Sequence, residues 1–192
     1  YLESVTMHRL FISLDIPPEI KTYISELLCE FKRTTKHNIV NLRWEAPEKY
    51  HITLKFIGNL SGDNLKLLIR KMFFIENRNS FQGYLDIFSA FPNEKNPRII
   101  ISKVEIQPKI YDLIVEINEQ LNEMGHRTEA MLFKPHITLL RLKENYDTSF
   151  INELLKLEFK KVEMKLDQVT IYDSKLKPSG SEYHKIQSYK LI

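Results

Sequence analysis

Several residue types and patterns are scarce in this chain of 192 residues, and each scarcity excludes a class of site. A single cysteine, Cys29, rules out a disulfide within the chain and argues against a Cys-ligated metal centre. The five glycines form neither a P-loop nor a GxGxxG pattern, so nucleoside triphosphate or dinucleotide binding has little support. HExxH and CxxC motifs, a spaced carboxylate cluster and a Ser nucleophile elbow are also missing. We therefore expect no metal and no cofactor.

The sequence has no apolar run of 18 residues and no signal-peptide pattern, which predicts a protein of the cytoplasm without membrane contact. Residues 1–6, ahead of Met7, are expected to be an expression remnant or upstream sequence. Residues 7–192 are expected to form a single domain of two closely joined lobes and to be monomeric. The net charge of +3 is mildly basic, which suits a phosphate-bearing ligand but falls short of a long nucleic-acid-binding stripe.

One tetrapeptide occurs twice, 85 residues apart, as His51-Ile-Thr-Leu54 and His136-Ile-Thr-Leu139. Each copy has the alternation of a β-strand, so its His and Thr point to one side while its Ile and Leu are buried on the other. In the first copy the predicted strand spans residues 50–57 and stops at Gly58. The face expected to be buried carries Tyr50, Ile52, Leu54 and Phe56. The opposite, polar face carries His51, Thr53 and Lys55.

Hydrophobic periodicity predicts the remaining elements. Strands are expected at 9–16, 40–44, 82–88, 98–104, 135–142, 161–172 and 183–189. Helices are expected after Pro18, after an Asp63 cap, from Pro108 to Gly125, and after a cap at Asp147 or Thr148. A helix follows each His strand, which indicates an internal duplication. This order favours an α+β fold over a doubly wound α/β fold.

The bare His-x-Thr pattern is weak evidence, because it occurs a third time at His126. That copy follows a helix-ending glycine and has charged neighbours, so we expect His126 to be exposed on the surface. The two apolar-backed copies form a pair, and the pair favours a functional site. One imidazole can act as acid and the other as base near neutral pH, while Thr hydroxyls can bind phosphoryl oxygens. Acid–base cleavage of a phosphodiester without metal uses all four groups.

At these residues the chain resembles the two-histidine phosphoesterase superfamily, and within it the RNA 2′,3′-cyclic phosphodiesterase family, formerly called 2′-5′ RNA ligase. The resemblance extends from Met7 to Leu191. The matching segments are Arg9-Leu-Phe-Ile12, Arg43-Trp44, 51–58, Ala90-Phe-Pro92, Pro97-Arg98, 133–141 with Arg141, Tyr172-x-Ser-x-Leu176, and Gly180-x-x-Tyr183.

The resemblance implies a bilobal α+β fold with pseudo-two-fold symmetry, duplicated antiparallel sheets, helices on the outer faces and a central groove. It implies hydrolysis of RNA 2′,3′-cyclic phosphate ends, tRNA fragments among them, to 2′-phosphates, with 2′-5′ ligation as the reverse reaction. His51 would be the proton donor and His136 the proton acceptor, although two identical motifs do not themselves distinguish acid from base. Thr53 and Thr138 would bind the phosphate. Candidates for further substrate contacts are Phe11, Trp44, Lys134 and Arg141.

Arg141 is five residues from His136, which in a regular strand would place it on the opposite face, so it reaches the site only if the strand bulges. Two alternatives to the main hypothesis stay open. The chain could be a two-histidine phosphodiesterase for 2′-5′ oligonucleotides or small cyclic nucleotides. It could also be a non-catalytic module that binds RNA or a nucleotide.

Overall fold

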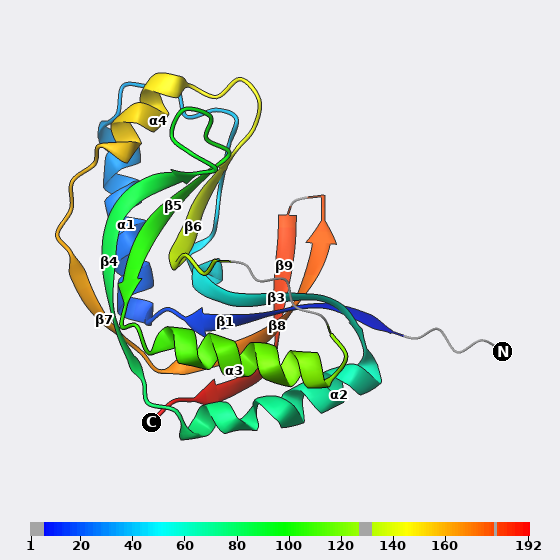
Figure 1. Cartoon of the computed structure of the whole chain (residues 1–192). Coiled ribbons are helices and arrows are strands. Elements are labelled where there is room, and N and C mark those ends of the chain that lie inside the picture. The colour runs from blue at the N-terminus through cyan, green and yellow to red at the C-terminus, as the bar shows by residue number, and fades with distance from the viewer. Residues whose placement is uncertain (1–5, 127–131, 179) are drawn as a thin grey trace.

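The computed structural model describes residues 6–126, 132–178 and 180–192, and it has an α+β fold built on one curled antiparallel sheet (Figure 1). Across the described residues, the strand order is β7-β4-β5-β6-β3-β1-β8-β9, and β2 pairs with β6. The first four strands are β7 (Val162–Leu166), β4 (Phe81–Phe91), β5 (Ile99–Ile106) and β6 (His136–Leu142). The other strands are β3 (His51–Ser61), β1 (Met7–Asp15), β8 (Gln168–Lys177), β9 (Gly180–Lys190) and the short β2 (Leu42–Trp44).

The sheet consists of two equivalent halves that meet between β3 and β6. In one half β1 lies between β3 and β8, and in the other β5 lies between β6 and β4. The two halves are joined in register at one pair, Ile52 with Ile137, both fully buried. The predicted two-lobed α+β fold with duplicated antiparallel sheets is thereby confirmed.

Helices cover the outer face of each half. The helices are α1 (Pro18–Thr34), α2 (Gly62–Lys71), α3 (Ile110–Glu123) and α4 (Thr148–Leu155), with short 3-10 turns at Pro47–Lys49 and Met72–Asn77. Figure 1 shows α1 and α4 beside β4, β5 and β6, and α2 and α3 together at the other half. Phe31 of α1 packs on Phe150 of α4, and Lys71 of α2 pairs with Glu123 of α3. None of the helices in the described ranges is long and apolar enough to cross a membrane.

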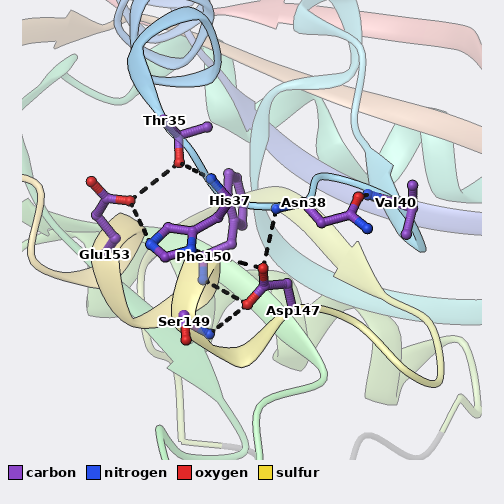
Figure 2. A network of polar contacts seen from close by, with 8 residues as sticks. All are labelled: Thr35, His37, Asn38, Val40, Asp147, Ser149, Phe150 and Glu153. Atoms are coloured by element: carbon purple, nitrogen blue, oxygen red, sulfur yellow. Dashed lines mark hydrogen bonds and ion pairs between the residues drawn. The ribbon is translucent and has the colours of Figure 1, made fainter.

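A polar network fixes the loop between α1 and β2 to the start of α4 (Figure 2). The carboxylate of Asp147 accepts hydrogen bonds from the backbone N–H groups of Ser149 and Phe150, at 2.8 and 3.3 Å, and from that of Asn38 at 3.1 Å. Asp147 is therefore the N-cap of α4, one of the two caps predicted for this helix. His37 Nε2 lies 3.3 Å from a carboxylate oxygen of Glu153 in the same network.

The prediction for the second half of the first His strand is wrong, because β3 contains β-bulges. Leu54 is an extra residue between two register pairs with β1, and a second irregularity precedes Gly58. A bulge moves the residues that follow it to the other face of the sheet. Phe56 consequently lies on the same face as His51 and is 65% exposed, and the strand continues past Gly58 to Ser61.

Two other predicted boundaries also need correction. The N-cap of α2 is Ser61, whose side chain accepts from the N–H of Asn64, and Asp63 instead lies in the first turn. The strand predicted at 161–172 is two strands, β7 and β8, which pair with β4 and β1 at separate places in the sheet. The break coincides with a change of phase, because β7 buries Met164 and Leu166 at even positions and β8 buries Val169 and Ile171 at odd positions.

The positive φ of Gly58 yields a stability prediction. Gly58 has φ +84°, and a Cβ added there would contact no atom within 4 Å. We expect Gly58→Ala to lower the free energy of unfolding by about 1–2 kcal/mol, since only the backbone conformation is penalised. Gly62→Ala is the control, because its Cβ also has open space and its φ is ordinary, and it should be neutral or slightly stabilising. Urea unfolding measures both, and equal effects would contradict the prediction.

Candidate active site

The two tetrapeptides lie side by side at the junction of the lobes. Ile52 of β3 pairs with Ile137 of β6 in antiparallel register, and these are the central residues of the two tetrapeptides. By the alternation of a strand, the His and Thr on either side of each Ile point to the face opposite to it. The four motif residues, called the square below, therefore lie around this one register pair, and each His has the Thr of its own strand two residues away.

Both imidazoles are anchored in the same way. His51 Nδ1 lies 2.6 Å from the carbonyl oxygen of Lys49, and His136 Nδ1 lies 2.7 Å from that of Lys134. A carbonyl can only accept a hydrogen bond, so Nδ1 carries the proton in each ring and Nε2 is left for chemistry. Nε2 of His51 is 3.1 Å from Oγ1 of Thr53.

Aromatic rings hold each imidazole in place. The ring centroids of Phe11 and Tyr183 lie 5.0 and 5.4 Å from that of His51. The ring of Phe91 meets His136 edge-on at 4.9 Å. These contacts restrict ring rotation and exclude water from part of each imidazole, and both effects favour a fixed direction for Nε2.

The two imidazoles have different charged surroundings. Burial lowers the pKa of both, as the largest effect on each, and the hydrogen bond to a backbone carbonyl raises both. For His51, Asp15 and Glu45 further raise the pKa and Lys21 lowers it. For His136, Arg141 lowers the pKa. Identical motifs thus lie in different electrostatic fields.

A bulge brings Arg141 to the site. Leu139 is an extra residue between the β5 pairings of Thr138 and Leu140, so the strand changes face there. Arg141 accordingly lies on the same face as His136, and its Nε donates to a carboxylate oxygen of Glu45 at 2.8 Å. Arg141 was expected to reach the site only if this strand contained a bulge, and the bulge at Leu139 is present. It is equivalent to the bulge at Leu54 in β3.

Two cavities adjoin the square, one at each end. The cavity at the His51 end, of about 500 Å³, is lined by His51, Phe11 and Tyr183 together with Arg9, Arg43 and Arg141. The cavity at the His136 end, of about 720 Å³, is more apolar and is lined by Thr53, His136, Phe91, Ile114, Phe133 and Lys134 among others. Phe56 borders both cavities.

The other predicted contact residues divide into two groups. Phe11 is 2% exposed and reaches the first cavity beneath His51, while Lys134 lines the second cavity. Trp44 lines neither cavity, since its ring packs edge-on against Phe150 at 6.2 Å and beneath Lys32 at 4.5 Å. The structure therefore does not bring Trp44 together with the other candidates.

His126 is not surface-exposed as expected. It is half-buried, lines the second cavity, and its Nε2 donates to the carbonyl oxygen of Ile57 at 2.6 Å. The rest of the third His-x-Thr copy, residues 127–129, lies outside the described residues. Within the described ranges, no group of three His, Cys, Asp or Glu side chains is arranged to hold a metal ion. Metal independence stays a prediction.

Sequence reasoning missed several residues that line the site, namely Arg9, Arg43, Phe56, Phe91 and Tyr183. All five belong to segments that carry the family resemblance, which was the available signal. Phe56 was assigned to the core because the strand was treated as regular. The others come from strands distant in sequence, and only the folded sheet brings them to one place.

Comparison with known sequences gives relatives that share one name. RNA 2′,3′-cyclic phosphodiesterase of Thermotoga maritima is 27% identical over 176 residues, covering 91% of each chain. The protein of the same name from Methanocaldococcus jannaschii is 28% identical, covering 94% of this chain and 99% of that one.

Solved structures share the fold. TT0787 of Thermus thermophilus superimposes with a TM-score of 0.75 at 22% identity, covering 95% of this chain and 97% of that one. Escherichia coli LigT complexed with 3′-AMP gives a TM-score of 0.74 at 21% identity, covering 97% and 99%.

The family model described as LigT like Phosphoesterase matches twice, over residues 14–101 and 101–183. Each match contains one His-x-Thr strand, β3 in the first and β6 in the second. The matches do not coincide with the halves of the sheet, because β4 of the first match lies in the half of β6 and β8 of the second lies in the half of β3. The chain belongs to the LigT like Phosphoesterase family.

Proposed function

We propose that this protein hydrolyses terminal 2′,3′-cyclic phosphates of RNA to 2′-phosphates, using His51 as acid and His136 as base. The observation that carries the proposal is the square of two His and two Thr with both Nδ1 atoms anchored to carbonyls. The names of the relatives from T. maritima and M. jannaschii support the choice of substrate. A site that only bound nucleotides would have no use for two oriented imidazoles.

The reaction follows from the arrangement of the four groups. His136 Nε2 removes a proton from water, and the water oxygen forms a bond to phosphorus while the bond from phosphorus to O3′ breaks. His51 Nε2 gives its proton to O3′, which becomes a hydroxyl, and the phosphate remains on O2′. Thr53 and Thr138 donate hydrogen bonds to the two non-bridging oxygens, where negative charge increases. Replacing water by the 5′-hydroxyl of a second RNA would form a 2′-5′ linkage.

Charge around the two imidazoles supports the assignment of acid and base. The residue paired with His51 on the neighbouring strand is Asp15, which raises the pKa of His51, whereas the charged side chain that acts on His136 is Arg141, which lowers its pKa. Asp15 is fixed by Thr170 Oγ1 at 2.8 Å and by Gln168 Nε2 at 2.7 Å. A carboxylate favours a protonated imidazole and a cation favours a neutral one. His51 is thus suited to give a proton and His136 to take one.

Removing either imidazole should abolish most of the activity. We expect His51→Ala and His136→Ala each to lower kcat by roughly 10²–10⁴-fold, because each removes a proton-transfer group. The substrate is an oligoribonucleotide with a 2′,3′-cyclic end, and mass spectrometry and NMR identify the product. His37→Ala is the control, since His37 belongs to the network at α4 (Figure 2) and should leave kcat unchanged.

The same assay separates the hypotheses. A 2′-phosphate product supports the proposal. A 3′-phosphate product would mean that O2′, and not O3′, is the leaving group. Turnover restricted to 2′-5′ oligonucleotides or small cyclic nucleotides would show that the substrate is a different phosphodiester. Absence of turnover on every diester, with binding retained, would identify a non-catalytic module.

The pH dependence of kcat/KM should be bell-shaped, with both limbs below the ordinary imidazole pKa of 6.5. Activity requires neutral His136 and protonated His51 in the free enzyme. Burial lowers the pKa of both groups. As pH rises, activity increases when His136 loses its proton and decreases when His51 loses its own, so the optimum lies on the acidic side. A steady-state profile with an optimum above pH 7 would contradict this mechanism.

Asp15→Asn should lower the pKa of His51, because the amide keeps the size of the side chain but removes the charge that favours imidazolium. NMR titration of the imidazole protons measures the pKa without reference to activity, and the falling limb of kcat/KM should move to lower pH with it. Asp63→Asn, at a side chain that is 95% exposed on α2, is the control. An unchanged or raised His51 pKa in Asp15→Asn would remove Asp15 from this role.

A further inference from the structure

The cavity at the His51 end holds an unusual concentration of positive charge. Arg43 of β2 and Arg141 of β6 are directly opposite each other in the register, and Arg9 of β1 lines the same cavity. Like charges directly opposite on neighbouring strands destabilise a sheet. An anion that lies between or beside the guanidinium groups offsets this repulsion.

Carboxylates within the protein balance only part of this charge. Glu45 pairs with Arg141, and in the described part of the chain no ion pair links Arg9 or Arg43 to a carboxylate. The charges of all of these groups affect the pKa of the Tyr183 hydroxyl. Burial chiefly raises its pKa and Glu45 raises it further, while Arg141, Arg9 and Arg43 each lower it. Three guanidinium groups therefore converge around one tyrosine with one carboxylate among them.

The guanidinium of Arg43 lies across a residue without a side chain. At Gly180, which has φ +129°, an added Cβ would fall 1.4 Å from Nη2 of Arg43. Only glycine at the start of β9 leaves room for the Arg43 side chain in this position. The backbone of β9 thus forms the floor on which the guanidinium rests inside the cavity.

The position of this cavity relative to the reacting phosphate identifies the anion, given the proposed function. The proton from His51 goes to O3′, so the terminal ribose must lie at the His51 end of the square. A cyclic mononucleotide has one phosphate, and the two His and two Thr hold it. The next phosphate along an RNA strand is attached to the 5′ oxygen of that same ribose, and it extends away from the square on the ribose side. Guanidinium groups bind phosphate oxygens through paired, charge-assisted hydrogen bonds.

We propose that Arg43 and Arg9, with Arg141 beside them, form a second phosphate subsite that binds the phosphodiester on the 5′ side of the terminal nucleotide. The substrate is then an RNA strand of two or more nucleotides, and a cyclic mononucleotide is a poor substitute. This inference rests on the proposed function, because the direction of the strand is set by the position of O3′ next to His51.

A substrate series tests the subsite. Its members are adenosine 2′,3′-cyclic phosphate, the same compound with a 5′-phosphate, the dinucleotide ApA with a 2′,3′-cyclic end, and that dinucleotide with a neutral methylphosphonate linkage. We expect kcat/KM to be at least about tenfold higher for the charged dinucleotide than for the mononucleotide, since each charge-assisted hydrogen bond contributes a factor of that order. The kcat/KM of the methylphosphonate dinucleotide should be close to that of the mononucleotide. A gain with the 5′-phosphate alone attributes the effect to the charge rather than to the second nucleoside.

The ratio of kcat/KM for dinucleotide over mononucleotide is the readout for variants. Arg43→Ala should bring this ratio close to one, and Arg43→Lys should retain part of it because the charge remains without the planar fork. Arg70→Ala, at an exposed arginine of α2, is the matched control and should keep the wild-type ratio. Thermal unfolding verifies that each variant is folded.

Three results would overturn the subsite. They are a wild-type ratio near one, a methylphosphonate dinucleotide that performs as well as the charged one, and an Arg43→Ala variant that loses activity equally on both substrates. If the wild-type protein hydrolyses none of these compounds, the proposed function fails and the subsite is judged by calorimetry instead. Adenosine 2′-phosphate and the dinucleotide ending in 2′-phosphate are then the probes. Equal affinity for the two would reject the subsite, and weaker binding of the dinucleotide to Arg43→Ala would support it.

Discussion

The contact on which the rest of the site depends is the antiparallel pairing of β3 with β6 at Ile52 and Ile137. It is the one register pair between these two strands, and it joins the two halves of the curled sheet. Both residues are fully buried, so this pair holds the lobes by apolar packing as well as by backbone hydrogen bonds. Shifting the register by one residue would turn the His and Thr side chains of one lobe away from those of the other.

The two identical motifs have different charged neighbours, and the proposed assignment of acid and base rests on that difference. The positions that face the two histidines across the sheet are occupied by Asp15 on β1 and by Lys103 on β5. Neither residue belongs to the repeated tetrapeptide, and neither is next to it in sequence. Strand pairing thus brings Asp15 close to His51 and raises the pKa of that imidazole, whereas the charge that lowers the pKa of His136 comes from Arg141 on the same strand. This is the physical reason why the sequence of the motifs alone left acid and base undecided.

Periodicity predicted what depends on regular local structure and failed where strands are irregular. The order of helices and strands, the α+β fold and the sharing of one sheet face by each His and Thr follow from alternation and capping. The exposure of Phe56 does not, because the bulge at Leu54 inverts the alternation after it. Trp44 and Arg43 are neighbours in sequence, yet Trp44 packs under α4 while Arg43 reaches the cavity. Which of two adjacent residues faces the site is decided by strand pairing, which no single segment encodes.

The two bulges also show how a duplicated strand can present different side chains at equivalent positions. Phe56 lies five residues after His51, and Arg141 lies five residues after His136. The bulge at Leu54 or at Leu139 brings each of them to the face of its histidine. The backbone device is the same in both lobes, while the side chain it delivers is an aromatic ring in one and a guanidinium in the other. The RNA end of the proposed function has an apolar base and an anionic backbone, so these equivalent positions, one aromatic and one cationic, would suit its two chemically different parts.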